Sequence, residues 1–77
     1  MSGKEVLGVG IAGAGWVATQ YVPAFEKNPH TKVVAIMSRR MVSCENLAKS
    51  SGLKDVKLYT DYRKLVDDPD VDIVAIC

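Results

Sequence analysis

The chain has 77 residues, of which 48% are hydrophobic and 25% are charged, and its formal net charge is +1. This length suffices for one small domain at most, and the near-neutral charge with mostly scattered basic residues argues against a nucleic-acid partner. No apolar run reaches the roughly 18 residues of a membrane span, and the polar N-terminus lacks the pattern of a signal peptide, so we expect neither membrane insertion nor export.

Strand and helix patterns alternate from the start of the chain. Residues 7–12 are an apolar run, as in a strand buried on both faces, and residues 16–27 continue with apolar residues at helical spacing. The expected apolar positions of this helix are Val17, Tyr21, Ala24 and Phe25. Pro23 should kink it or loosen one of its backbone hydrogen bonds. Residues 31–37 are predicted to form the second strand.

The alternation continues in the second half of the chain. Ser43 is a plausible N-cap for the next helix, and Gly52 stands where a helix C-terminal glycine belongs. Thr60 or Asp61 can cap a later short helix. The predicted elements of this half are a helix over residues 44–50, a strand over 56–59, a short helix through Val66 and a strand over 71–77.

This order of elements predicts an α/β fold with a parallel sheet and right-handed crossovers. In a Rossmann-like, doubly wound sheet the strand order is 3-2-1-4, and about four strands make such a sheet incomplete. Ligands bind beyond the C-terminal ends of the strands, at the switch point between the first and fourth strands. Gly13, Ser38 and Cys77 all fall at that edge.

The pattern Gly13-x-Gly15-x-x-Ala18 follows the first strand and opens the first helix. Gly13 allows the tight turn, Gly15 lets the backbone approach a pyrophosphate, and the small Ala18 lets helix and strand pack closely. The free N–H groups of the first helical turn then face the phosphates. The pattern therefore predicts a dinucleotide-binding turn.

The end of the second strand carries no acidic residue. NAD-binding units place an Asp or Glu about 20 residues beyond the glycines to hold the ribose 2′-hydroxyl. Here that offset falls on Ser38, which is followed by Arg39 and Arg40. Ser38 can donate a hydrogen bond and Arg39 can pair with a phosphate, so we expect NADP(H) to be preferred over NAD(H).

Several segments resemble the glucose–fructose oxidoreductase/inositol dehydrogenase (Gfo/Idh/MocA) family. They are residues 9–15, the helix segment 22–25, the Ser38-Arg39 strand end, and the later segments 58–62 and 68–76. The Tyr-Thr-Asp-Tyr run at residues 59–62 and the Asp-Pro-Asp-Val-Asp run at residues 68–72 are the most specific. The resemblance covers nearly the whole chain.

This resemblance implies an NAD(P)-dependent oxidoreductase acting on a sugar, a cyclitol or a related polyol. Residues 1–77 would be the N-terminal portion of its dinucleotide-binding domain. The catalytic residues and the substrate domain would lie elsewhere in a parent enzyme that forms a homo-oligomer, and we expect this chain alone to be inactive. Gly13, Gly15, Trp16 and Val17 would face the pyrophosphate and the helix start, and Ser38, Arg39 and Arg40 would surround the adenosine ribose.

Two other functions fit parts of the pattern. A non-catalytic NAD(P)-sensing module would use the same glycine turn without a catalytic lysine. A methyltransferase also has a glycine-rich first turn but usually carries an acidic residue just before it, and residues 9–12 contain none. Trp16 could either wall the cofactor pocket or cover the edge of the sheet.

Other reactive side chains have simpler interpretations. His30 is expected in a surface turn, and Tyr59 and Tyr62 are expected to pack rather than to donate protons. The aspartates at residues 67, 68, 70 and 72 lack the glycine and glutamate of a calcium loop, so we interpret them as a solvated turn. Cys44 and Cys77 have no metal-ligand spacing and are too few for a disulfide framework, which favours a cytoplasmic protein without a metal site.

Overall fold

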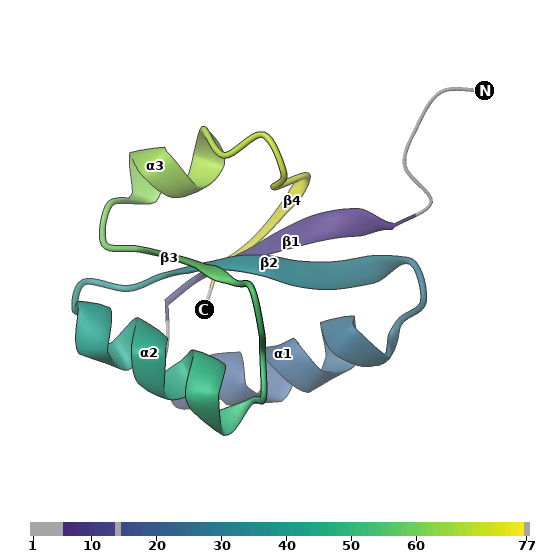
Figure 1. The fold of residues 1–77 in the computed structure, drawn as a ribbon, viewed down its shortest axis with the longest axis horizontal. Coiled ribbons are helices and arrows are strands. Elements are labelled where there is room, and N and C mark those ends of the chain that lie inside the picture. The colour runs from purple at the N-terminus through teal and green to yellow at the C-terminus, as the bar shows by residue number, and fades with distance from the viewer. Residues whose placement is uncertain (1–5, 14, 77) are drawn as a thin grey trace.

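The computed structural model describes residues 6–13 and 15–76, which form one four-stranded parallel sheet in the order β3-β2-β1-β4. The elements are β1 (Leu7–Ala12), α1 (Trp16–Lys27), β2 (Thr31–Met37), α2 (Met41–Ser50), β3 (Lys57–Tyr59), α3 (Tyr62–Val66) and β4 (Ile73–Ile76). Helices α1 and α2 cover one face of the sheet and α3 covers the other (Figure 1). The predicted doubly wound α/β fold is confirmed.

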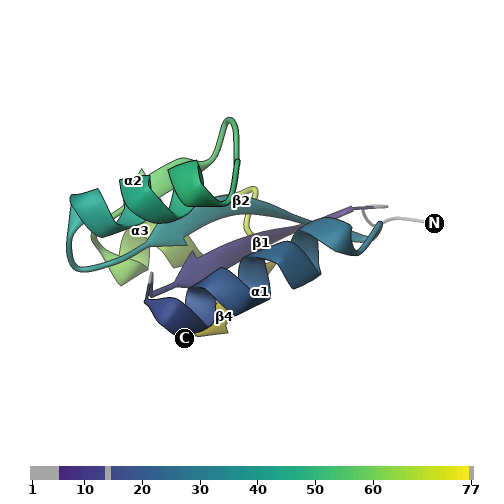
Figure 2. The same cartoon turned by 90° about the horizontal axis from the view of Figure 1, so that it is seen from below.

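Two layers of apolar side chains flank the sheet. The larger core lies between the sheet and the pair α1 and α2, which lie next to each other on one face (Figure 2). The smaller core, on the α3 side, contains Ala12, Ala35 and Leu65. Leu65 is fully buried, and burying one such side chain stabilises a fold by about 1.5–3 kcal/mol. None of the described helices is long and apolar enough to cross a membrane.

The buried face of α1 differs from the prediction. Val17, Tyr21 and Ala24 are exposed, and the helix instead buries Ala18 and Val22. Residues 18, 22 and 25 have the same helical spacing as residues 17, 21 and 24, shifted by one position. Periodicity alone therefore does not tell which of these two sets faces the sheet. The fully buried Ala18 lets α1 lie close to the sheet. The helix continues through the exposed Pro23 to Lys27.

Several predicted boundaries also differ. Helix α2 begins at Met41 rather than residue 44, so Ser43 is not its N-cap: the N-cap is Arg40, whose carbonyl already accepts from the Ser43 amide at 3.0 Å. Strands β3 and β4 begin at Lys57 and Ile73, one and two residues later than predicted. The predicted strand end Cys77 lies outside the described residues.

Two predicted helix ends are confirmed. The Asp61 carboxylate caps α3 by accepting from the Arg63 amide at 2.9 Å. Gly52 follows α2 with a φ of 68°, a value that favours glycine, and its amide donates to the carbonyl of Lys49.

Glycines on β1 let the α3 layer approach the sheet. A Cβ on Gly10 would lie 2.9 Å from Cδ1 of Leu65, and a Cβ on Gly8 would collide with the backbone oxygen of Asp70. Gly8 is also bound twice by Asp72, whose amide donates to its carbonyl at 2.7 Å and whose carboxylate accepts from its amide at 2.8 Å. These contacts hold the chain against β1 just before β4 begins.

The aspartate-rich turn is not simply solvated, so that interpretation was wrong for Asp68. Asp68 is only 5% exposed and accepts from the Tyr59 hydroxyl at 2.7 Å, the Asp70 amide at 2.8 Å and Lys57 Nζ at 3.0 Å. Lys57 also pairs with the Asp70 carboxylate at 2.8 Å. The hydrogen bond from Tyr59, followed by that from the Asp70 amide, lowers the pKa of Asp68.

These contacts give the turn a structural role. Its buried carboxylate joins β3 to the segment between α3 and β4, and Tyr59 uses its hydroxyl in that link. Within the part of the chain that the structure describes, no group of three or more His, Cys, Asp or Glu side chains could hold a metal ion.

Gly8→Ala should destabilise the protein by about 3 kcal/mol, because its Cβ needs space that the Asp70 carbonyl occupies. Urea unfolding measures this change. Gly15→Ala is the matched control, since a Cβ there meets no atom within 4 Å, and its free energy of unfolding should change by at most about 0.5 kcal/mol. Equal stability of the two variants would contradict the close approach of the turn to β1.

Asp68→Asn should lower stability at neutral pH by removing the charge that Lys57 and Tyr59 stabilise. Because the folded-state pKa of Asp68 is lowered, its contribution is complete above the unfolded pKa of about 3.9 and is lost as the pH falls through the folded value. The difference in melting temperature between wild type and variant should therefore be constant near neutrality and shrink in acid. Asp67→Asn, at an exposed neighbour, is the control. A pH-independent difference would contradict this role.

Candidate functional site

The turn between β1 and α1 is built on two glycines with different tasks. Gly13 has a φ of 108°, which residues with a side chain rarely adopt, and its amide donates to the carbonyl of Met37 at 2.7 Å. The turn is thereby tied to the end of β2. Gly15 is the N-cap residue of α1 and provides no side-chain cap. Residue 14 lies outside the described residues.

The start of α1 is open to an approaching group. A Cβ on Gly15 would meet no atom within 4 Å, so the space in front of this backbone is free. The first turn of α1 contains no acidic residue that would repel an anion. With 12 residues, α1 is long enough for its backbone dipoles to favour negative charge at this end. These features fit a pyrophosphate.

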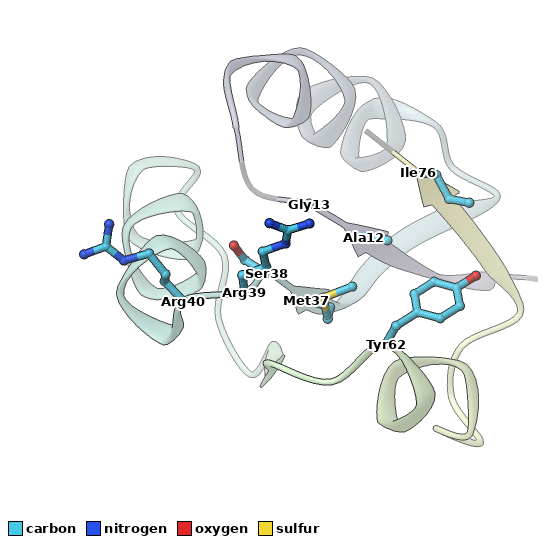
Figure 3. Close-up of a pocket in the computed structure, with 8 residues that line it drawn as sticks. All are labelled: Ala12, Gly13, Met37, Ser38, Arg39, Arg40, Tyr62 and Ile76. Atoms are coloured by element: carbon cyan, nitrogen blue, oxygen red, sulfur yellow. The ribbon is translucent and has the colours of Figure 1, made fainter.

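A cavity of about 400 Å³ lies at the same edge of the sheet. It is lined by Ala12, Gly13, Met37, Ser38, Arg39, Arg40, Tyr62 and Ile76 (Figure 3). The cavity thus joins the C-terminal ends of β1, β2 and β4 to the first residue of α3. This is the switch point of the sheet, where ligands of doubly wound folds bind.

The cavity has a polar side and an apolar side. Ser38 and Arg39 lie on one side, and the guanidinium of Arg39 points towards Gly13, whereas the side chain of Arg40 points away from the other lining residues (Figure 3). Met37, Tyr62 and Ile76 supply the apolar side. No lining residue is acidic. The cavity therefore suits a ligand with an anionic part and an apolar part.

The end of β2 is fixed from the neighbouring strand. The Ser38 amide donates to the carbonyl of Tyr59 at 3.1 Å, and the Cys44 thiol donates to the same carbonyl at 3.4 Å. Burial raises the pKa of the Cys44 thiol, which keeps it neutral and unreactive. Ser38 is thus held in place while the guanidinium of Arg39 remains exposed beside it.

The predicted site residues separate into two groups. Gly13, Ser38, Arg39 and Arg40 line the cavity, which brings two distant sequence signals together. Gly15, Trp16 and Val17 lie at the start of α1 and are not among the lining residues. Trp16 is 76% exposed and is not among the residues that line the cavity, so it is not a wall of the cavity in this structure.

His30 lies at the opposite end of the sheet. It is exposed, and its carbonyl accepts from the amide of Leu7, the first residue of β1. The cavity is at the other end of β1, beyond Ala12. This position agrees with the predicted surface turn and separates His30 from the site.

Four lining residues were missed. Ala12, Met37 and Ile76 are the last residues of β1, β2 and β4, and strand order alone could have placed them at this edge. Tyr62 is different, because it comes from the first turn of α3 in the other layer of the fold. Only the packing of α3 on the sheet brings it to the cavity.

Comparison with known proteins agrees with the family resemblance of the sequence over nearly the whole chain. The sequence model of the oxidoreductase family with an NAD-binding Rossmann fold (GFO_IDH_MocA) matches residues 7–77. The uncharacterized oxidoreductase YrbE of Bacillus subtilis (strain 168) is 34% identical over 74 residues, which cover 96% of this chain and 21% of that protein.

Solved structures with a similar fold include two complexes with cofactor. Myo-inositol dehydrogenase from Lactobacillus casei, in complex with NAD(H) and myo-inositol, gives a TM-score of 0.85 at 26% identity over 94% of this chain and 21% of that one. KijD10, a 3-ketoreductase from Actinomadura kijaniata in complex with TDP-benzene and NADP, gives a TM-score of 0.78 at 30% identity over 90% of this chain and 21% of that one. The chain spans about a fifth of the length of these relatives.

Gly15→Val should leave the fold intact and weaken dinucleotide binding. The new side chain enters free space, so stability should change by no more than about 1 kcal/mol. It occupies the place where the backbone would meet a phosphate, and losing a hydrogen bond to a charged group weakens binding by about tenfold to a hundredfold. Calorimetric titration with NADPH and NADH measures this loss. Unchanged affinity in a folded variant would contradict the assignment of this turn.

Proposed function

The chain belongs to the Gfo/Idh/MocA family of oxidoreductases, and on that premise we propose that it is the cofactor-binding part of an NAD(P)-dependent enzyme. Its substrate would be a sugar, a cyclitol or a related polyol or carbonyl compound. The observation that carries the proposal is the cavity that joins Gly13 to Ser38 and Arg39 at the switch point of the sheet. The named relatives, an inositol dehydrogenase and a 3-ketoreductase, support the substrate class.

The residues at this edge fit the successive parts of a dinucleotide. Gly13 and Gly15, with the first turn of α1, would bind the pyrophosphate through backbone N–H groups. Trp16 and Val17 would flank it, and Ser38 would donate to the adenosine ribose. The nicotinamide, when bound, supplies or accepts the hydride. This chain's part is to bind and orient the cofactor.

We propose NADP(H) as the preferred cofactor, with NAD(H) as the second choice. A carboxylate at the end of β2 would repel a 2′-phosphate, and neither Ser38 nor the two residues after it is acidic. Arg39 has no ion-pair partner among the residues that the structure describes, so its guanidinium is available to a phosphate. Although Arg40 lines the cavity, its side chain points away from the other lining residues, so Arg39 should contribute most of the discrimination between NADPH and NADH.

The double variant Ser38→Asp with Arg39→Ala should reverse this preference. A carboxylate replaces the donor, and the cation that would pair with the 2′-phosphate is lost. The ratio of NADPH affinity to NADH affinity should fall by about tenfold to a hundredfold. Calorimetric titration of both cofactors measures this ratio.

Arg40→Ala is the matched control for that variant. Because its side chain points away from the other lining residues, the ratio of NADPH affinity to NADH affinity should change by less than about threefold, a difference below roughly 1 kcal/mol. A double variant that keeps the wild-type ratio would show that the end of β2 does not select the cofactor.

The remaining parts of the proposal concern the whole enzyme. Residues 1–77 would form the N-terminal portion of its dinucleotide-binding domain, and the catalytic residues and substrate domain would belong to the rest of a homo-oligomer. We propose a cytoplasmic location for the enzyme, and the buried free thiol of Cys44 is compatible with it. The enzyme would act on a small molecule, without nucleic acid or membrane as a partner.

A non-catalytic NAD(P)-sensing module is the second candidate, because no lining residue of the cavity is a His, Lys, Asp or Glu that could act as a general base. Both candidates require cofactor binding by this chain. Hydride transfer to a sugar or cyclitol by the longer protein that carries this sequence would decide for the enzyme, and cofactor binding without any transfer would decide for the sensor.

A further inference from the structure

We propose that the outer edge of β4 and an exposed apolar stripe of α1 form an interface through which two copies of this chain pair into a symmetric dimer. The stripe consists of Val17, Tyr21 and Ala24, which are all exposed. In the dimer β4 would lie against β4 of the second copy, and the two sheets would become one. The inference goes beyond the proposed function and does not depend on cofactor binding.

β4 has an unprotected outer edge. It is the last strand on its side of the sheet, so within the described part of the chain its outer backbone groups face no other strand. Its sequence, Ile-Val-Ala-Ile, contains no charged residue and no proline, and Ile76 is 74% exposed. An apolar edge strand of this kind is a template for pairing with a further strand.

The opposite edge of the sheet is protected. β3 is shorter, with three residues, and begins at the exposed Lys57, which pairs with Asp68 at 3.0 Å and with Asp70 at 2.8 Å. Short strands and charged side chains, Lys above all, discourage pairing at an edge. A head-to-tail assembly would need both edges and would grow without closing, whereas β4 against β4 closes after two copies.

The exposed stripe of α1 faces the β4 side of the molecule. α2 lies on one side of α1, and β4 lies on the other (Figure 2). α1 is right-handed and runs antiparallel to β1, so the positions just before the buried Ala18 and Val22 turn away from α2 and towards β4. The Tyr21 ring contacts that of Phe25, with 6.5 Å between their centroids, and Phe25 packs against the same core as Ile73. The stripe and the strand edge therefore form one surface.

The absence of charge on this surface favours a second copy as the partner. Residues 16–24 and 73–76 contain no Asp, Glu, Lys, Arg or His. A two-fold axis brings residues close to their own copies, so a charge near the axis would repel itself. Tyr21 is at the middle of α1, and an axis through the middle of β4 would bring the two Tyr21 side chains together.

The size of the surface sets the expected affinity. The 12 residues of α1 extend over about 18 Å. A strip of that length, covering one helix layer and the edge of the sheet, buries roughly 500 Å² on each copy, which reaches the total of about 1,000 Å² that a specific contact needs. We therefore expect a reversible dimer with a Kd on the order of 10–100 μM.

Sedimentation equilibrium of the 77-residue chain, from about 2 μM to about 500 μM, tests the proposal. The samples are wild type, Tyr21→Lys, Tyr21→Glu and an equal mixture of these two variants. Val42→Lys and Val42→Glu are the controls, because Val42 is 48% exposed on α2 and Tyr21 is 46% exposed on α1. Circular dichroism checks that every variant is folded.

The wild-type chain should change from monomer to dimer with rising concentration and should grow no further. Each Tyr21 variant alone should dimerise at least about tenfold more weakly, because two like charges meet near the axis. The mixture should dimerise about tenfold more tightly than either variant alone, because opposite charges then meet. The Val42 variants, alone or mixed, should stay within about threefold of wild type.

Hydrogen exchange of the wild-type chain tests the strand pairing itself. The β4 amides that point away from β1 should become more protected as the concentration rises, whereas those of β3 should not. A chain that stays monomeric throughout would overturn the proposal and leave the β4 edge to a strand of another polypeptide. Growth beyond two copies would also overturn it, as would a dimer that the Tyr21 variants do not weaken.

Discussion

The close approach of the α3 layer to β1 is the constraint on which the rest of the structure depends. Gly8 and Gly10 leave the space that Asp70 and Leu65 occupy, and Asp72 then joins the chain to Gly8 immediately before β4. This places β4 alongside β1 and brings Ile76 next to Ala12 in the sheet. Without that approach there would be no switch point, because the cavity needs the ends of β2 and β4 on either side of β1.

The same arrangement separates structural from functional polar groups. Lys57, Tyr59 and Asp68 satisfy one another in the turn between α3 and β4, and Cys44 is a buried neutral thiol below the end of β2. By contrast, Arg39 has no ion-pair partner among the described residues and faces a cavity without acidic side chains. An anionic cofactor binds best where a positive charge without an ion-pair partner is already in position, as the Arg39 guanidinium is beside the glycine turn.

Much of the fold could be predicted from local patterns. Strand order and the convergence of Gly13 with Ser38 followed from alternating elements and from the rule for doubly wound sheets. Periodicity alone predicted the wrong buried face of α1, since residues 17, 21 and 24 and residues 18, 22 and 25 have the same helical spacing. The small Ala18 of the glycine pattern, which is buried against the sheet, was the sequence signal that separates the two. The burial of Asp68 and the place of Tyr62 in the cavity lining were also missed. Both depend on contacts between segments that are distant in the sequence.

The central claim is that the glycine turn, the end of β2 and the start of α3 form one cofactor site. Amide chemical shifts of the labelled chain during titration with NADPH test this most directly. The account predicts saturable changes confined to Gly13, Gly15 and the first turn of α1, residues 38–40, Tyr62 and Ile76, with none at His30. Changes centred on another surface, or none at saturating NADPH, would contradict it.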